Sequence, residues 1–162
     1  MLLPAEFGAL LAELNAEELP YVVVGGVAVN LLGAERATGD VDVLVPATAD
    51  QGAAIRRMLE RLGGTRPDGS PLPEALFDGA HHVRALTRYG LIDFIPEGEG
   101  SLAYSAVRAG ARLSDLHGVL VPRAGLAHLV ALKRVADRPI DRQDLARLEQ
   151  AYGPLPELDE RS

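Results

Sequence analysis

Two aspartates, one residue apart within an apolar run, are the residues best placed for chemistry. Residues 40–45 read DVDVLV. A strand points alternate side chains to opposite faces, so Asp40 and Asp42 are expected to share a face. Aspartate is disfavoured in strands, and like charges on one face repel each other unless water or a cation relieves them. Carboxylate oxygens suit Mg²⁺ or Mn²⁺. The pair therefore predicts a divalent-metal site, or alternatively a solvated edge strand.

A glycine pair lies upstream, at a predicted junction of strand and helix. Residues 21–24 (YVVV) are typical of a buried strand, Gly25-Gly26 interrupts it, and a helix is expected over residues 27–32. Glycine lets a ligand approach the backbone, and the start of a helix offers free N–H groups. The pair predicts a phosphate seat or, alternatively, a simple turn. Its spacing matches neither the dinucleotide-binding fingerprint nor a Walker A loop.

The surrounding pattern must hold these residues in place. Apolar spacing and breaker residues predict helices over residues 5–15, 50–62, 101–109, 126–136 and 141–152, a hairpin of strands 82–87 and 91–95, and a short strand over 119–121. Thr48 or Asp50 is expected to cap the second helix, and Asp141 the last. Residues 65–80 form a loop, either a substrate lid or a connector. The pattern indicates an α/β (α+β) fold on one mixed sheet, with a single domain over residues 1–153 and a polar tail over 154–162.

Composition excludes several classes of function. The chain has 162 residues, no cysteine and a net charge of −7, so thiolate zinc sites and a general basic surface for nucleic acid are not expected. No apolar run is long enough for a membrane span and the N-terminus is a poor signal peptide, so we expect a cytoplasmic protein that does not bind membranes. His81-His82 has no partner at zinc-ligand spacing. Lys133 is the only lysine among 16 basic residues.

The order of these features resembles one superfamily. The strand, Gly25-Gly26, a short helix, Arg36-x-Thr38 and Asp-x-Asp resemble the nucleotidyltransferases, which include DNA polymerase β, the tRNA CCA-adding enzymes and the minimal nucleotidyltransferases. Thirteen residues separate Gly26 from Asp40. The version GGxAxNxxG…RxTxDVD looks most similar to the AbiEii-type nucleotidyltransferases of bacterial toxin–antitoxin systems and their relatives. The likeness is densest over residues 21–45 and extends loosely to about residue 150.

The resemblance implies a small mixed sheet flanked by helices and a third carboxylate on a later strand. Asp93, within LIDFI, is the matching residue. An aspartate among apolar neighbours is costly unless it is paired, hydrogen-bonded or metal-bound. The alternative to a metal ligand is that Asp93 lies near a turn and caps a neighbouring residue. Asp40, Asp42 and Asp93 are thereby implied as catalytic residues and as ligands of Mg²⁺ (or Mn²⁺), with Asp93 also able to take a proton from the acceptor.

The resemblance also implies which residues bind the nucleotide. Gly25 and Gly26 would seat phosphates, and Arg36 and Thr38 lie just before the carboxylates. The guanidinium of Arg36 could contact phosphate or pair with Asp40.

The segment around Lys133, with Arg138-Pro139-x-Asp141-x-x-Asp144, looks like the ending of these small proteins. Lys133 could reach the triphosphate, or it could be a surface lysine on an amphipathic helix. Asp144 could orient Lys133, but we favour a role at the N-terminus of the last helix.

The implied function is transfer of NMP from an NTP, such as ATP, to a hydroxyl on an RNA 3′ end, a protein or a small molecule. A toxin–antitoxin role with a cognate toxin or antitoxin protein is also implied. The alternative is a non-catalytic nucleotide-binding or antitoxin-like module of the same fold. The chain has no room for a large C-terminal RNA-binding helical domain.

Overall fold

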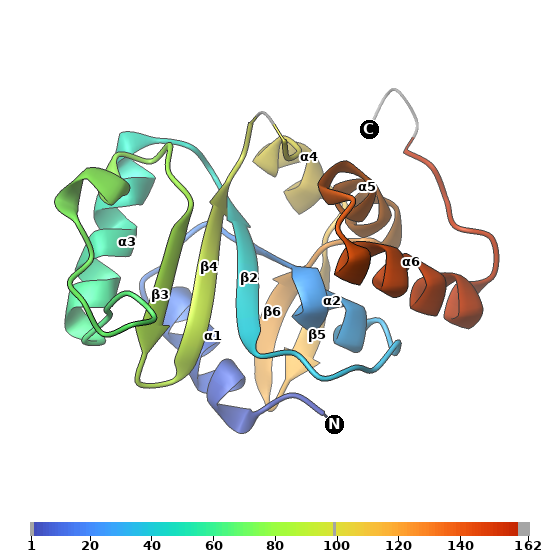
Figure 1. The fold of residues 1–162 in the computed structure, drawn as a ribbon, viewed down its shortest axis with the longest axis horizontal. Helices are drawn as coiled ribbons and strands as arrows, with labels where there is room; N and C mark the ends of the chain where they lie inside the picture. The colour runs from blue at the N-terminus through green and yellow to red at the C-terminus, as the bar shows by residue number, and fades with distance from the viewer. Residues whose placement is uncertain (1, 99, 159–162) are drawn as a thin grey trace.

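A mixed β-sheet organises the chain. The computed structural model describes residues 2–98 and 100–158. Within these residues, six strands lie in the order β3-β4-β2-β1-β6-β5 (Figure 1). Their bounds are β1 Val22–Val24, β2 Asp40–Val45, β3 Val83–Thr87, β4 Gly90–Pro96, β5 Arg112–Leu116 and β6 Val119–Arg123. The pairs β2–β4 and β1–β6 are parallel, whereas β1–β2 and the hairpins β3–β4 and β5–β6 are antiparallel.

The helices leave part of one sheet face open. They are α1 Ala5–Ala16, α2 Gly25–Leu31, α3 Ala49–Arg61, α4 Tyr104–Ala109, α5 Leu126–Ala136 and α6 Pro139–Tyr152, with a short 3-10 turn at Glu74–Phe77. Figure 1 shows α1 and α3 behind the sheet, and α2 and α6 in front of it towards the β5 edge. In the described residues, no helix combines the length and apolar character needed to cross a membrane.

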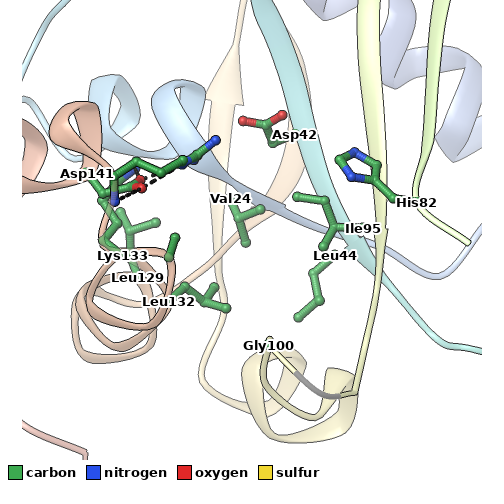
Figure 2. A pocket seen from close by; sticks show the side chains of 13 residues that line it. Val24, Asp42, Leu44, His82, Ile95, Gly100, Leu129, Leu132, Lys133 and Asp141 are labelled. Carbon is green, nitrogen blue, oxygen red and sulfur yellow. Dashed lines mark hydrogen bonds and ion pairs between the residues drawn. The ribbon is translucent and has the colours of Figure 1, made fainter.

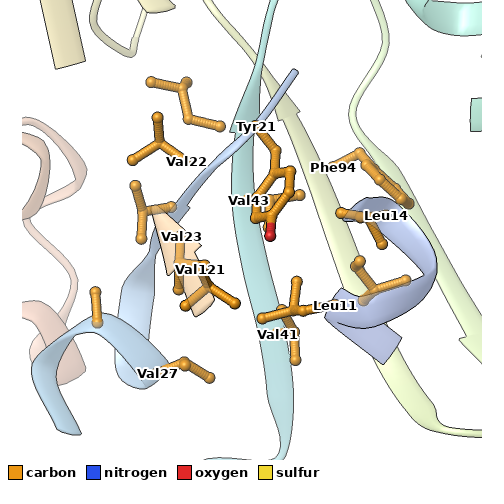
Figure 3. Close-up of a cluster of buried hydrophobic side chains, with 14 of the residues drawn as sticks. Leu11, Leu14, Tyr21, Val22, Val23, Val27, Val41, Val43, Phe94 and Val121 are labelled. Carbon is orange, nitrogen blue, oxygen red and sulfur yellow. The ribbon is translucent and has the colours of Figure 1, made fainter. Parts of the chain in front are cut away.

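The core explains why β2 presents its aspartates to the open face. Val41 and Val43 are fully buried and point towards Leu11 and Leu14 of α1 (Figure 3). Burying one such leucine stabilises the fold by about 1.5–3 kcal/mol. Alternation along the strand then directs Asp40 and Asp42 to the other side.

The predicted fold class is confirmed, as are the hairpin and the bounds of α5. The Thr48 side chain caps α3 by accepting a hydrogen bond from the backbone N–H of Gln51 at 3.1 Å. The expectation of a structureless loop over residues 65–80 is wrong in part, because it contains the 3-10 turn and Thr65 pairs with Leu86 as an isolated bridge.

Three further expectations need correction. Strand β5 was not predicted, because Arg112–Leu116 (RLSDL) lacks a β-branched run. Helix α4 begins at Tyr104 rather than at 101. The backbone N–H of Tyr104, the first of the helix, donates to the Glu97 carboxylate. Helix α6 begins at Pro139 rather than at 141, because proline fits the first helical position and Asp141 acts as the third residue of a capping box. Of the predicted tail, residues 159–162 lie outside the described residues.

Candidate active site

Strand register brings the three aspartates together. Asp42 of β2 lies beside Asp93 of β4, and Asp93 lies opposite Arg84 of β3, so the three side chains form a row across the sheet. Asp40 stands two residues before Asp42 on the same face. One carboxylate oxygen from each aspartate lies within 4.8 Å of the others, close enough to share a metal ion. This donor set of hard oxygens fits Mg²⁺ or Mn²⁺.

The carboxylates cannot all ionise freely. Burial, the charge of Asp40 and the proximity of Asp93 raise the pKa of Asp42 to about 7. Burial also acts on Asp93, but hydrogen bonds to its carboxyl from His82 and the charge of Arg84 outweigh it and lower its pKa. Asp42 therefore holds a proton up to about pH 7, and a divalent cation would displace it.

Two side chains of the β3 strand region contact Asp93, and sequence reasoning missed both. His82 Nε2 lies 2.9 Å from Asp93 Oδ1, and this contact raises the pKa of His82. Arg84 Nη1 donates to Asp93 Oδ2 at 2.5 Å and to Asp40 Oδ2 at 2.8 Å. The signal was the two-residue spacing of His82 and Arg84 in a strand that pairs with LIDFI, but only the register makes it visible.

The glycine pair forms the first two residues of α2, so the expected helix over 27–32 begins earlier, at Gly25. Both glycines are required by close packing. Gly25 has φ +64°, and a Cβ built on it would lie 2.1 Å from Asp42 Oδ2. A Cβ on Gly26 would lie 2.7 Å from Thr38 Oγ1 and 2.8 Å from the Arg36 guanidinium. The backbone of the turn therefore sits directly against the carboxylate row, which is the close approach that glycine permits. The second glycine also leaves no room for a serine side chain.

A buried ion network lies on the other side of this turn. Asp144 is fully buried, and it accepts from Arg36 Nε at 2.6 Å and lies 2.8 Å from Lys133 Nζ. Asp141 is also buried and lies 3.3 Å from Lys133 Nζ. Arg138 Nε donates to Asp141 at 2.7 Å. Burial would raise the pKa of both aspartates, but the adjacent arginine and lysine lower it, so both are charged.

This network corrects three interpretations. Arg36 pairs with Asp144 and not with Asp40, because its guanidinium turns towards α6. Lys133 is not a surface lysine, since only 4% of it is exposed. Asp144 orients Lys133 and Arg36 instead of serving the helix N-terminus, because it lies on the second turn of α6, facing inward.

Two cavities flank the row. One, of about 340 Å³, has an apolar wall that includes Val24, Leu44 and Leu129, and a polar edge that includes Asp42, His82, Lys133 and Arg138 (Figure 2). The other, of about 400 Å³, is polar and is lined by the following side chains among others: Arg36, Thr38, Asp40, Arg84, Asp93 and Arg138. Asp42 lines both. Each volume is in the range of a small-molecule site.

Comparisons with known proteins identify the fold. No family model matches the sequence, and no curated protein matches it. The solution structure of the antibiotic-resistance factor ANT(2″)-Ia matches with a TM-score of 0.60 at 16% identity, over 91% of this chain and 83% of that one. The crystal structure of ANT(2″)-Ia with adenylyl-2″-tobramycin matches with a TM-score of 0.56 at 17% identity, over 88% and 85%.

A third solved structure points the same way. A Thermotoga maritima protein assigned as a nucleotidyltransferase matches with a TM-score of 0.60 at 13% identity, over 93% of this chain and 96% of that one. At these identities the likeness concerns the fold, and the chain therefore has the fold seen in nucleotidyltransferases.

Proposed function

We propose that this nucleotidyltransferase-fold chain is an enzyme that transfers NMP from an NTP to a hydroxyl group. The observation that carries the proposal is the convergence of Asp40, Asp42 and Asp93 between two cavities, directly beside the glycine turn. A solvated edge strand does not account for it, because β2 lies inside the sheet between β4 and β1. Asp93 is also only 3% exposed.

Asp40, Asp42 and Asp93 would hold Mg²⁺ or Mn²⁺. Such an ion, when bound, neutralises triphosphate charge and polarises the phosphoryl group. The remaining work falls to the chain itself, which must seat the triphosphate and place the acceptor in line with it.

The triphosphate fits the edge of the 340 Å³ cavity. Gly25 lies there with Lys133 and Arg138, which supply positive charge. Lys133 is held as a fixed point charge by the two aspartates of α6, so little ordering is needed when phosphate binds. The apolar wall of Val24, Leu44 and Leu129 would pack against the nucleoside. Thr38 and the Arg36 guanidinium pack against Gly26 from behind.

The acceptor would enter from the 400 Å³ cavity, whose lining includes Asp93. Its hydroxyl oxygen would attack the α-phosphorus while the bond to the β-phosphate breaks and pyrophosphate leaves. Asp93 would take the hydroxyl proton, because its lowered pKa keeps it in the ionised form. This sequence forms one P–O bond and breaks one.

The charge of the second cavity restricts the acceptor. Among the described residues that line it, the acidic ones are Asp40, Asp42 and Asp93, which are committed to the metal or to Arg84. The basic ones are Arg36, Arg84 and Arg138, each paired with an aspartate, so no carboxylate is left free to bind a cationic acceptor. We therefore propose a neutral or anionic hydroxyl acceptor. A polycationic acceptor such as tobramycin, whose adenylyl-2″ derivative is bound in the ANT(2″)-Ia crystal structure, would meet no free carboxylate here.

The test is transfer of label from each α-labelled NTP, with Mg²⁺ or Mn²⁺, to RNA, to protein in a lysate and to small molecules, including tobramycin. We expect transfer to RNA or to an uncharged or anionic hydroxyl compound, and none to tobramycin. The Asp40→Asn/Asp42→Asn variant should lose transfer, whereas Asp50→Asn/Asp68→Asn, which removes equal charge from exposed positions, should keep it. Absence of transfer in every mixture, with NTP still bound, would instead support the non-catalytic module.

A toxin–antitoxin role and a cytoplasmic location remain predictions from the sequence. The first is tested by whether a protein encoded beside this chain co-purifies with it and changes its transfer activity.

A further inference from the structure

Arg84, on the edge hairpin β3–β4, bridges two aspartates of the row. Arg84 Nη1 lies between two carboxylates, 2.8 Å from Asp40 Oδ2 and 2.5 Å from Asp93 Oδ2. A single donor shared by two carboxylates stands where a cation bridging them would stand. Because β3 pairs with β4 and places Arg84 opposite Asp93, this position follows from the strand register.

The oxygens of Asp93 are both engaged by protein donors. His82 Nε2 contacts Oδ1 at 2.9 Å, and Arg84 contacts Oδ2. The Asp93 side chain is only 5% exposed, so a second cation could bind its oxygens only by displacing one of these donors. Asp42, in contrast, forms no ion pair with an arginine, lysine or histidine of the described residues, and it lines both cavities.

The charges of the row balance with one ion. Once the cation has displaced the proton of Asp42, the three carboxylates carry three negative charges, which Arg84 with one positive charge and one divalent cation with two would balance. A second divalent cation would have to compete with the Arg84 guanidinium for oxygens at hydrogen-bonding distance.

We infer that Arg84 replaces the second metal ion of a two-ion centre, so that this protein binds one divalent cation and, of the three aspartates proposed above as ligands, Asp40 and Asp42 hold it. This inference rests on the proposed metal-dependent function and deepens it. Arg84 then supplies the positive charge on the acceptor side, where it holds Asp93 towards the attacking hydroxyl. The arrangement substitutes a side chain that is always charged for an ion that must be captured from solution.

The test counts bound Mn²⁺ by electron paramagnetic resonance on the full chain, with Mn²⁺ alone and with α,β-methylene-ATP present. Two ions about 3.5–4 Å apart are magnetically coupled, and their spectrum differs from that of isolated Mn²⁺. We expect one uncoupled Mn²⁺ at the carboxylates of the wild-type protein. The Arg84→Gln variant should gain a second ion and show the coupled spectrum, and Arg84→Lys, which keeps the charge, should stay at one.

The control is Arg88→Gln, which removes the same charge from the same hairpin. Arg88 bonds the backbone carbonyl of Arg61 and lies over Tyr89, and it contacts none of the aspartates of the row, so its variant should bind one ion. A coupled pair in the wild-type protein would overturn the inference while leaving the metal centre intact, and so would an Arg84→Gln variant that still binds one ion. If the wild-type protein binds no Mn²⁺, or binds only Mn²⁺ that the Asp40→Asn/Asp42→Asn variant also binds, the metal-dependent function itself fails. The coupled or uncoupled spectrum of the wild-type protein tests the one-ion count even if a variant does not fold.

Discussion

Replacing Asp144 with asparagine is expected to destabilise the protein strongly, although the side chains are nearly the same size. Asp144 is fully buried and carries the charge that balances Arg36 and Lys133. Removing one partner of a buried ion pair costs about 3–5 kcal/mol, because the other charge is left without compensation. Lys133 keeps Asp141 at 3.3 Å, and the Arg36 side chain is 14% exposed and can reach water. Both facts place the expected loss near the lower end, about 3 kcal/mol.

The measurement is the free energy of unfolding from urea titration followed by far-ultraviolet circular dichroism, since the chain has no tryptophan. A loss of about 3 kcal/mol is a large share of the 5–15 kcal/mol typical of a domain. It should lower the melting temperature by about 6–12 °C. A loss below about 1 kcal/mol, the value of an exposed ion pair, would refute the reasoning.

A control and a pH series sharpen the test. Asp137→Asn makes the same chemical change in a neighbouring ion pair, with Arg142, whose side chains are both more than 60% exposed, and it should leave the unfolding curve almost unchanged. The folded-state pKa of Asp144 is below its ordinary value. Its contribution is therefore complete above the unfolded pKa, about 3.9, and is lost as the pH falls through the folded pKa. The gap between wild type and Asp144→Asn should close in that acid range.

Three further predictions concern the carboxylate row and a helix cap. Because the pKa of Asp42 is raised to about 7, the metal-free protein should lose stability as the pH rises from about 4 to 7, and Asp42→Asn should be more stable than wild type at pH 8 in urea titrations with EDTA. Gly25→Ala and Gly63→Ala impose similar backbone strain, about 1–2 kcal/mol, at φ +64° and +67°. Because only Gly25→Ala adds a clash with Asp42, it should have the lower melting temperature of the two, and it alone should weaken Mn²⁺ binding in a calorimetric titration. Thr48→Ala should cost about 1 kcal/mol in the same urea assay because it removes the cap of α3, and an unchanged midpoint would contradict that assignment.

The metal-ligand half of the site could be predicted from local patterns. Alternation along DVDV places Asp40 and Asp42 on one face whatever the sheet order, and an aspartate inside LIDFI must be compensated. The nucleotidyltransferase resemblance supplied the link between the two strands, and the structure brings the carboxylates together as expected. What they bind remains a prediction.

The other half depends on information that local patterns do not hold. Arg84 and His82 reach Asp93 only because β3 and β4 pair in one register, and shifting it by one residue would turn both away. The partner of Arg36 lies 108 residues along the chain, so neighbouring Asp40 was the natural candidate and the wrong one. Burial of Lys133 could not be read from its helix, because it depends on how α6 packs against α5.

The place of α6 has a consequence for the order in which the site is completed. The carboxylate row is built from strands that end by Pro96, whereas the charges that fix Lys133 and Arg36 arrive only with α6, Pro139–Tyr152. Local detachment of that helix would therefore leave a pocket able to hold a cation but no longer shaped to grip a triphosphate. Nucleotide affinity would then report on whether the final helix is seated, and a chain still emerging from the ribosome would acquire its two binding capacities in succession.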